Sequence, residues 1–219
     1  MLKSKIFLTA DTHFSHAKII EYEPHTRRFD SVDAMNESLC ENWNSVVSAG
    51  DTVYMLGDVA LGHLATSLPE NISRLNGTKI LISGNHDRNF VTRERARKAE
   101  LGSSVRAKQY RLLKKWHEFY LDNGFTAVYY DAIVQDFGYG RWLLSHFPYV
   151  GDSYASKDRY QHCRPSDNGV PLVHGHVHSQ WQTALTSNGT PMVNVGVDAR
   201  ALYPVPVEVV ANEFEELKR

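Results

Sequence analysis

Two histidines, His176 and His178, are the residues in this sequence whose type and spacing best suit chemistry. They follow Leu172 and Val173, which are typical of a buried strand. On an extended backbone, side chains two residues apart point to the same side, so both imidazoles would face one site. Gly175 has no side chain and would let other groups approach the backbone closely. Imidazole pairs bind borderline transition metals, but one pair indicates a metal site only together with other ligands.

Further polar side chains follow other strand-like segments. The apolar runs 6–10, 52–56 and 79–83 have the length and composition of buried strands, and each is followed by polar groups. These polar groups are Asp11 and His13, then Asp58, then Asn85, His86 and Asp87; His146 follows a later strand. Because ligands bind beyond the carboxyl ends of strands in open α/β sheets, we expect these side chains to share one site.

The ligand set contains carboxylates, imidazoles and one amide, but no thiol. This mixture suits manganese, iron, zinc or similar divalent ions better than a structural all-cysteine zinc site. The set is too large for one tetrahedral ion and fits two ions roughly 3.5–4 Å apart that share one carboxylate. The sequence therefore favours a dinuclear site.

The elements that must position these groups alternate between strands and helices. Apolar residues with helical spacing predict helices over 31–47, with Ser31 as the cap, and over 64–75. This alternation predicts an α/β fold with a parallel sheet.

The second half of the chain is richer in strand signals. Residues 125–134 and 139–144 predict a hairpin that leads to His146, and residues 192–197 and 205–210 predict the final strands. The acidic tail from Asn212 is expected to be exposed.

The segment 88–122 interrupts this pattern with ten lysines or arginines against four acids. It predicts a basic helical insertion of two helices. The second helix would be amphipathic, with an apolar face made of Leu112, Leu113, Trp116, Phe119 and Tyr120. The basic side chains form either a solvated face or a wall that attracts an anionic substrate.

Composition fits a single domain over residues 1–219, and the net charge of −1 gives no overall attraction to nucleic acid or membrane. Neither a signal peptide nor an apolar run of about 20 residues is evident. Cys40 and Cys163 are expected to be thiols in a reducing cytoplasm. The oligomeric state is left open.

The order Asp11-x-His13, Gly57-Asp58, Gly84-Asn85-His86-Asp87, His146 and Gly175-His176-x-His178 resembles the calcineurin-like metallophosphoesterases. The blocks are weak signals individually but strong together, and they span residues 11–178 in the family's order. The segment from Asp11 to His16, followed by Arg27-Arg28-Phe29, is similar to small bacterial and phage-type members. The resemblance implies a four-layer α/β/β/α sandwich with two metals at the sheet edge.

The resemblance also implies a role for each ligand. One ion would be held by Asp11, His13, Asp58 and His178, and the other by Asp58, Asn85, His146 and His176. Asp58 would bridge the two ions. His86 would face the substrate as the general acid, with Asp87 orienting its ring. Mn²⁺ is the favoured ion, with Fe, Zn, Ni and Mg as alternatives.

The resulting hypothesis is a phosphoesterase in which a metal-bridging hydroxide attacks a small phosphodiester or phosphomonoester. A cyclic nucleotide is one candidate substrate by resemblance. A nuclease acting on DNA or RNA is the alternative, because the basic segment could contact phosphates. A non-catalytic metal-binding scaffold is less favoured, because no ligand is missing. Candidate substrate contacts are His16, Arg27, Arg28, Arg159 and His162.

Overall fold

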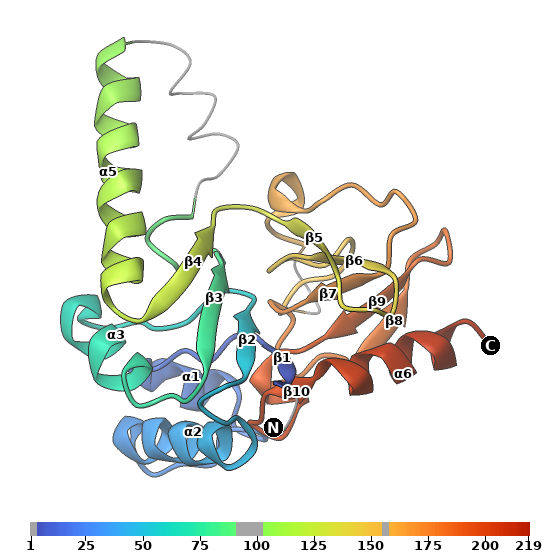
Figure 1. The fold of residues 1–219 in the computed structure, drawn as a ribbon, viewed down its shortest axis with the longest axis horizontal. Coiled ribbons are helices and arrows are strands. Elements are labelled where there is room, and N and C mark those ends of the chain that lie inside the picture. Colours follow the sequence, from blue (N-terminus) through green and yellow to red (C-terminus); the bar gives the residue numbers. More distant parts are fainter. Residues whose placement is uncertain (1–3, 91–102, 155–157) are drawn as a thin grey trace.

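The strands of this protein form two five-stranded sheets in a computed structural model that describes residues 4–90, 103–154 and 158–219 (Figure 1). The first sheet has the order β10 (Val205–Pro206), β1 (Ile6–Thr9), β2 (Thr52–Met55), β3 (Thr78–Ile82) and β4 (Phe125–Tyr129). Strands β1 to β4 are parallel, as the alternation predicted, and β10 is antiparallel to β1.

The second sheet has a parallel centre and antiparallel edges. Its order is β5 (Ile133–Asp136), β6 (Arg141–Leu144), β7 (Leu172–His174), β9 (Pro191–Asn194) and β8 (Thr183–Leu185). Strands β6, β7 and β9 run parallel, so β6 and β7 present their carboxyl ends at the same edge.

The described α-helices are α1 (Ala17–Tyr22), α2 (Val32–Val46), α3 (Leu64–Ile72), α5 (Ser103–Asp122) and α6 (Val207–Leu217). The predicted helices over 31–47 and 64–75 correspond to α2 and α3. Ser31 caps α2 as expected, because its side chain accepts a hydrogen bond of 3.1 Å from the Ala34 N–H. None of the described helices is long and apolar enough to cross a membrane.

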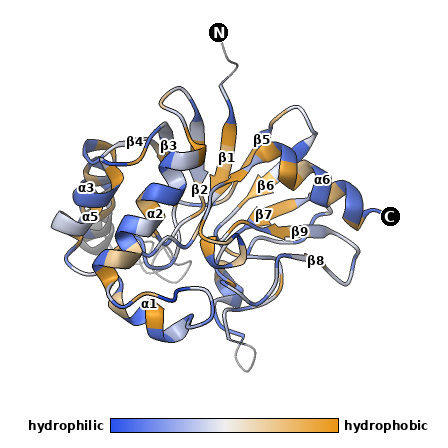
Figure 2. Cartoon of the chain, turned by 90° about the horizontal axis from the view of Figure 1, so that it is seen from below, coloured by the Kyte–Doolittle hydropathy of each residue, from blue (hydrophilic) through white to orange (hydrophobic). Residues whose placement is uncertain are grey.

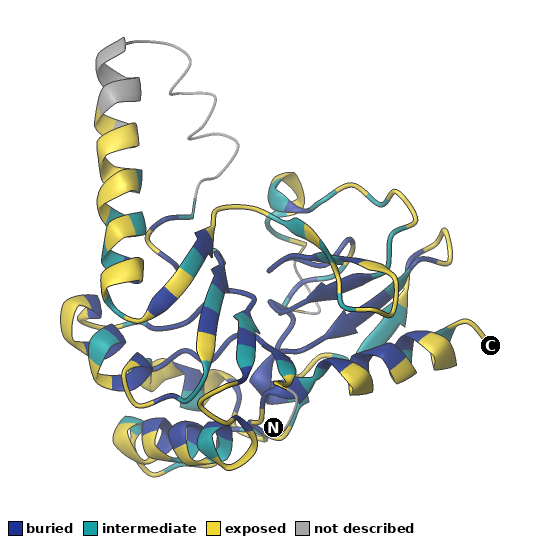
Figure 3. Ribbon diagram, viewed as in Figure 1, coloured by how far each residue is buried: buried dark blue, intermediate teal, exposed yellow. Residues whose placement is uncertain are grey.

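Side chains on the two faces of the first sheet belong to two different hydrophobic cores. Phe7, Val53 and Leu81 pack with helices α2, α3 and α5, and the buried Cys40 belongs to this core. Their neighbours Leu8 and Ile82 face the second sheet, and apolar residues of α6 join this second core. Figure 2 shows the apolar strands of both sheets, and Figure 3 shows that they are buried while the outer helix faces are exposed. The sheets therefore stack through a shared core, which brings their ends together.

The predicted strand over 125–134 is in fact two strands in different sheets. Strand β4 ends at Tyr129 and pairs with β3, whereas β5 begins at Ile133 and pairs with β6. Asp131 between them is exposed, and its carboxylate accepts a hydrogen bond from the Ala132 N–H at 2.8 Å. The chain therefore crosses between the two sheets at residues 130–132, where the sequence suggested one continuous strand. The β5–β6 hairpin itself was predicted.

The strand predicted over 205–210 was wrong beyond Pro206, because α6 begins at Val207. The acidic tail from Asn212 belongs to this helix, and Asn212, Glu215 and Glu216 are exposed as expected. Val207, Val210 and Phe214 are buried at helical spacing. A short apolar run cannot by itself distinguish a strand from a buried helix segment, which explains the error.

Helix α5 is the second helix predicted for the basic segment; the first falls largely on residues 91–102, outside the described residues. Trp116, Phe119 and Tyr120 pack against the core as expected. Leu112, predicted on the same face, is 51% exposed. The described side chains of α5 that pack with the core therefore lie in its C-terminal half, and Figure 3 shows exposed turns before them.

Candidate metal centre

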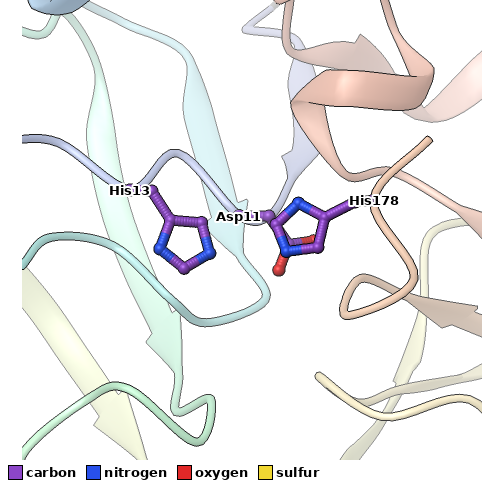
Figure 4. A group of neighbouring side chains, drawn as sticks. All are labelled: Asp11, His13 and His178. Atoms are coloured by element: carbon purple, nitrogen blue, oxygen red, sulfur yellow. The ribbon is translucent and has the colours of Figure 1, made fainter. Parts of the chain in front are cut away.

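The predicted ligands lie together beyond the carboxyl ends of strands in both sheets. Asp11, Asp58 and Asn85 follow β1, β2 and β3, whereas His146 and His176 follow β6 and β7. Figure 4 shows Asp11 and His13 beside His178, which comes from the opposite end of the chain. The sheet topology therefore brings together residues that are up to 167 positions apart, from 11 to 178.

The backbone at these ligands is left-handed, not extended. The φ angles are 55° at Asp11, 49° at His13, 55° at Asp58, 71° at His176 and 48° at His178. The expectation that paired ligands point the same way because they lie on a strand was therefore wrong. Non-glycine residues rarely adopt positive φ, and such conformations concentrate at functional sites. Tight turns beyond the strands, not pleating, direct these side chains.

Glycines give the ligand loops room to pack closely. A Cβ atom on Gly175 would lie 2.5 Å from Asp11 Oδ2, which confirms that this glycine permits close approach. A Cβ on Gly57 or Gly84 would lie 2.8 Å from His146 Nδ1. These distances are far below a normal van der Waals contact, so any larger residue would displace a predicted ligand.

His146 brings three acceptors together. Its Nδ1 lies 2.8 Å from the Leu56 carbonyl oxygen, which can only accept, so Nδ1 carries the proton. Burial lowers the pKa of His146, so the ring is neutral and Nε2 has a free lone pair. That lone pair faces Asp58 Oδ2 at 3.5 Å and Asn85 Oδ1 at 3.0 Å.

The ligand atoms form two overlapping groups. Asp11, His13 and His178 make one group and Asp11, Asp58 and His146 make the other, each with ligand atoms within 4.8 Å of one another. Asp58 Oδ2 also lies 3.7 Å from His13 Nε2. Asp11 is thus common to both groups, while Asp58 contacts ligands from each. Whether Asp58 is the bridging carboxylate stays a prediction.

Several buried ligand atoms have no hydrogen-bond partner among the described residues. They are Asp11 Oδ1, both ring nitrogens of His13, and His176 Nε2. Leaving buried polar atoms unpaired is costly, and most native proteins avoid it. Divalent cations accept lone pairs from carboxylates and imidazoles alike, so the residues present fit the expected metal ions.

The pKa shifts of the predicted ligands also favour a cation bound among them. Burial raises the pKa of Asp11 to about 6 and raises the pKa of Asp58, because both carboxylates lie away from water. Burial lowers the pKa of His13, where nearby cationic groups act in the same direction. A cation held between them would stabilise both carboxylates and the neutral imidazole.

Asp198 orients His178 and was missed by the sequence analysis. Its Oδ2 lies 2.8 Å from His178 Nδ1, which leaves Nε2 to face the site. Burial alone would lower the pKa of His178, but this hydrogen bond and the Asp11 charge raise it to about 9. Asp198 directly follows the predicted strand over 192–197, so the signal used for the other ligands could have found it.

Arg27 is a structural residue, contrary to the expectation that it binds substrate. Its side chain is fully buried and donates to Asp198 Oδ1 at 2.8 Å from Nε and to Asp198 Oδ2 at 3.0 Å from Nη2. It also donates to the carbonyl oxygens of Thr12 and Asp11. Arg27 therefore fixes the first ligand loop and holds the pKa of Asp198 well below its usual range, although burial acts the other way.

His86 lies open to the cleft, as expected of a residue that faces substrate, whereas Asp87 has a different environment from the one expected. The His86 side chain is 43% exposed, and its Nε2 lies 3.9 Å from Asp58 Oδ2. The Asp87 carboxylate accepts hydrogen bonds from the N–H groups of Asp58, Val59 and Gly84. Among the described residues no hydrogen bond joins Asp87 to the His86 ring, so Asp87 fixes the ligand loops rather than that ring.

The ligands open into a cleft of about 520 Å³ between α1 and the loop after β6. Of the candidate substrate contacts, His16 and Arg159 line this cleft. Arg28 and His162 are exposed and do not line it. Arg159 is held by Asp152, a buried carboxylate 3.6 Å from His176 Nε2. Asp152 follows no predicted strand, so its position at the site could not be predicted from the sequence.

Comparison with known proteins finds relatives among mycobacteriophage proteins. No family model matches the chain. It is 33% identical over 218 residues to the Gene 66 protein of Mycobacterium phage D29, covering 97% of this chain and 98% of that one. It is 31% identical over 198 residues to the Gene 66 protein of Mycobacterium phage L5, covering 90% and 87%.

A comparison with solved structures supports the fold. The crystal structure of a protein of unknown function, AQ665, from Aquifex aeolicus, matches with a TM-score of 0.65 and 23% identity. The match covers 96% of this chain and 99% of that one, which supports the mixed α/β fold along the whole chain. On the strength of the phage relatives, the chain belongs to the Gene 66 protein family of mycobacteriophages D29 and L5.

Proposed function

We propose that this protein is a dinuclear metal-dependent phosphoesterase that hydrolyses a small phosphoester. The observation that carries the proposal is the acceptor cluster at His146. The neutral His146 ring donates its Nδ1–H to the Leu56 carbonyl oxygen. Its Nε2 lone pair therefore points at the side-chain oxygens of Asp58 and Asn85. Lone pairs that face one another without a proton between them call for a cation.

The residues around the cleft have distinct roles in this proposal. Two divalent ions, when bound, would polarise a phosphoryl oxygen and supply hydroxide near neutral pH. His86 is partly exposed at the cleft and donates a proton to the departing alkoxide. Asp58 Oδ1 accepts the His86 backbone N–H at 2.9 Å, so one carboxylate links the acid to the ligand cluster.

The four-layer metallophosphoesterase sandwich, the choice of Mn²⁺ and the cytoplasmic location belong to this proposal. The two stacked sheets and the ligand loops at their edge support the family resemblance. The nuclease alternative gains nothing from the basic side chains of α5, because no described residue of α5 lines the cleft. A non-catalytic metal-binding scaffold is less favoured, because no predicted metal ligand is missing and His86 is accessible at the cleft.

Hydrolysis assays with added Mn²⁺ test the proposal. Bis-p-nitrophenyl phosphate and p-nitrophenyl phosphate report diester and monoester cleavage, and we expect turnover that a chelator abolishes and fresh metal restores. Elemental analysis of the same samples gives the metal content. If the protein binds two ions per chain yet cleaves neither ester, the scaffold hypothesis replaces this one. If it takes up no ion from excess metal, the proposed site is wrong.

A further inference from the structure

A second hollow shares two lining residues, Asn85 and His86, with the main cleft. It measures about 270 Å³ and is lined by Ala60, Leu61, Gly62, Leu64, Asn85, His86 and Arg88. Because a water molecule takes about 30 Å³ of liquid, this hollow has room for a substantial chemical group and not only for an isolated water. His86 therefore stands between two spaces. Of the predicted ligands that line these spaces, Asn85 lines both, whereas His13, Asp58, His176 and His178 line the larger one.

A close backbone contact at Gly62 and hydrogen bonds near Arg88 hold the backbone around the second hollow in place. Gly62 has a φ of +80°, and a Cβ there would lie 3.1 Å from the Ser15 carbonyl oxygen. The Arg88 N–H donates to the Tyr120 hydroxyl at 3.2 Å, and that hydroxyl donates to Asp87 at 3.3 Å. Through Asp87, the backbone of Arg88 is tied to the same loops that carry the predicted metal ligands.

Arg88 contributes a positively charged side chain to the lining of this hollow. Its side chain is exposed, and its guanidinium carbon lies 6.0 Å from the centre of the Trp116 ring. No carboxylate of the described residues forms an ion pair with it, whereas Arg159 in the main cleft is neutralised by Asp152. An arginine without a carboxylate partner beside a hollow is well suited to bidentate binding of phosphate.

We propose that the substrate is an open-chain phosphodiester whose two ester arms occupy different hollows, with Arg88 binding a second phosphate on one arm. This inference rests on the proposed phosphoesterase function. Water forms the new P–O bond and loses one proton to solvent, while the ester P–O bond breaks and its oxygen takes a proton from His86. A monoester has only one arm. In a cyclic nucleotide both ester oxygens belong to one ring, so its arms cannot diverge around His86.

Thymidine dinucleotides test the proposal, with unphosphorylated TpT compared with its 5′-phosphorylated and 3′-phosphorylated forms. We expect the wild-type protein with Mn²⁺ to cleave one phosphorylated form with a kcat/KM at least about tenfold above that for TpT, the typical minimum for a charge-assisted hydrogen bond. Arg88→Ala should bring this ratio close to one, and Arg88→Lys should retain part of it, because lysine keeps the charge without the bidentate geometry.

Arg28→Ala is the matched control, because Arg28 is also an exposed arginine but lines neither hollow. It should leave the ratio unchanged. A wild-type ratio near one, a ratio that Arg88→Ala leaves intact, or 3′,5′-cyclic thymidine monophosphate as the best substrate would each overturn the inference while hydrolysis itself stands. Failure to cleave any of these compounds or bis-p-nitrophenyl phosphate, with metal bound, would refute the proposed function and this inference with it.

Discussion

The substitution Asp198→Asn tests how the buried ion pair supports the candidate metal centre. The Asp198 carboxylate accepts hydrogen bonds from Arg27, Thr26 and His178, at distances of 2.8 to 3.0 Å. Removing its charge would leave the Arg27 guanidinium fully buried without a counter-charge. Breaking a buried pair in this way costs about 3–5 kcal/mol. We therefore expect the free energy of unfolding to fall by about that amount.

The measurement is urea unfolding of the metal-free protein at neutral pH, followed by fluorescence. Glu37→Gln is the matched control, because Glu37 also pairs with an arginine, Arg74, but the two side chains are 54% and 42% exposed. Exposed pairs contribute about 0.2–1 kcal/mol, so this variant should remain near wild type. Equal losses in both variants, or a loss below about 1 kcal/mol in Asp198→Asn, would refute the reasoning.

The same variant should weaken metal binding. Asp198 fixes the protonated nitrogen of His178, and replacing such outer carboxylates typically lowers metal affinity about 10–100-fold. Calorimetric titration with Mn²⁺, under conditions in which circular dichroism shows the variant to be folded, measures this change. Wild-type affinity in the folded variant would show that Asp198 stabilises the fold without orienting the ligand.

Further predictions concern the proposed acid, the shared carboxylate, the ligand loops and pH. His86→Ala should keep its metal content but lose about 10²–10⁴-fold in turnover of esters with poor leaving groups; loss of metal would contradict its assignment as the acid. Asp58→Asn should lose at least one ion per chain by elemental analysis, and full occupancy would argue against bridging. Gly175→Ala should lower the thermal midpoint and the metal affinity, because its Cβ would lie 2.5 Å from Asp11 Oδ2; unchanged values would show that the loops relax freely. The raised pKa of Asp11, about 6 against an ordinary 3.8, makes a contribution to metal-free stability that is complete below pH 3.8 and is lost as pH rises through 6. Because metal binding requires the ionised carboxylate, Mn²⁺ should raise the unfolding midpoint more at pH 7.5 than at pH 5, and an equal rise at both would exclude this coupling.

The sequence predicted the strand ends well because their signal is local. A short apolar run followed by a polar residue can be recognised without knowing the fold, which is why β1, β2 and β3 were anticipated to within one residue of their observed ends. The same rule selected Asp11, Asp58 and Asn85. Parallel strands then require these residues to share an edge, so their proximity followed from the topology that the alternation indicated.

Other features depended on contacts that the sequence does not encode locally. The left-handed φ of His176 and the burial of Arg27 arise from packing between loops that are far apart in the chain. An arginine that binds phosphate and one that pairs with a buried carboxylate look identical in a sequence. Only burial and the position of Asp198 separated the two possibilities.

By itself, then, the sequence determined which side chains could bind metal and that strand ends would present them. The tertiary structure decided how they are held: Asp198 behind His178, Asp87 behind the ligand loops, and Arg88 beside a second hollow. The physical reason is that the choice of ligand atom depends on residue type, which is a local property. Hydrogen-bond partners, burial and pKa instead depend on which segments meet in space.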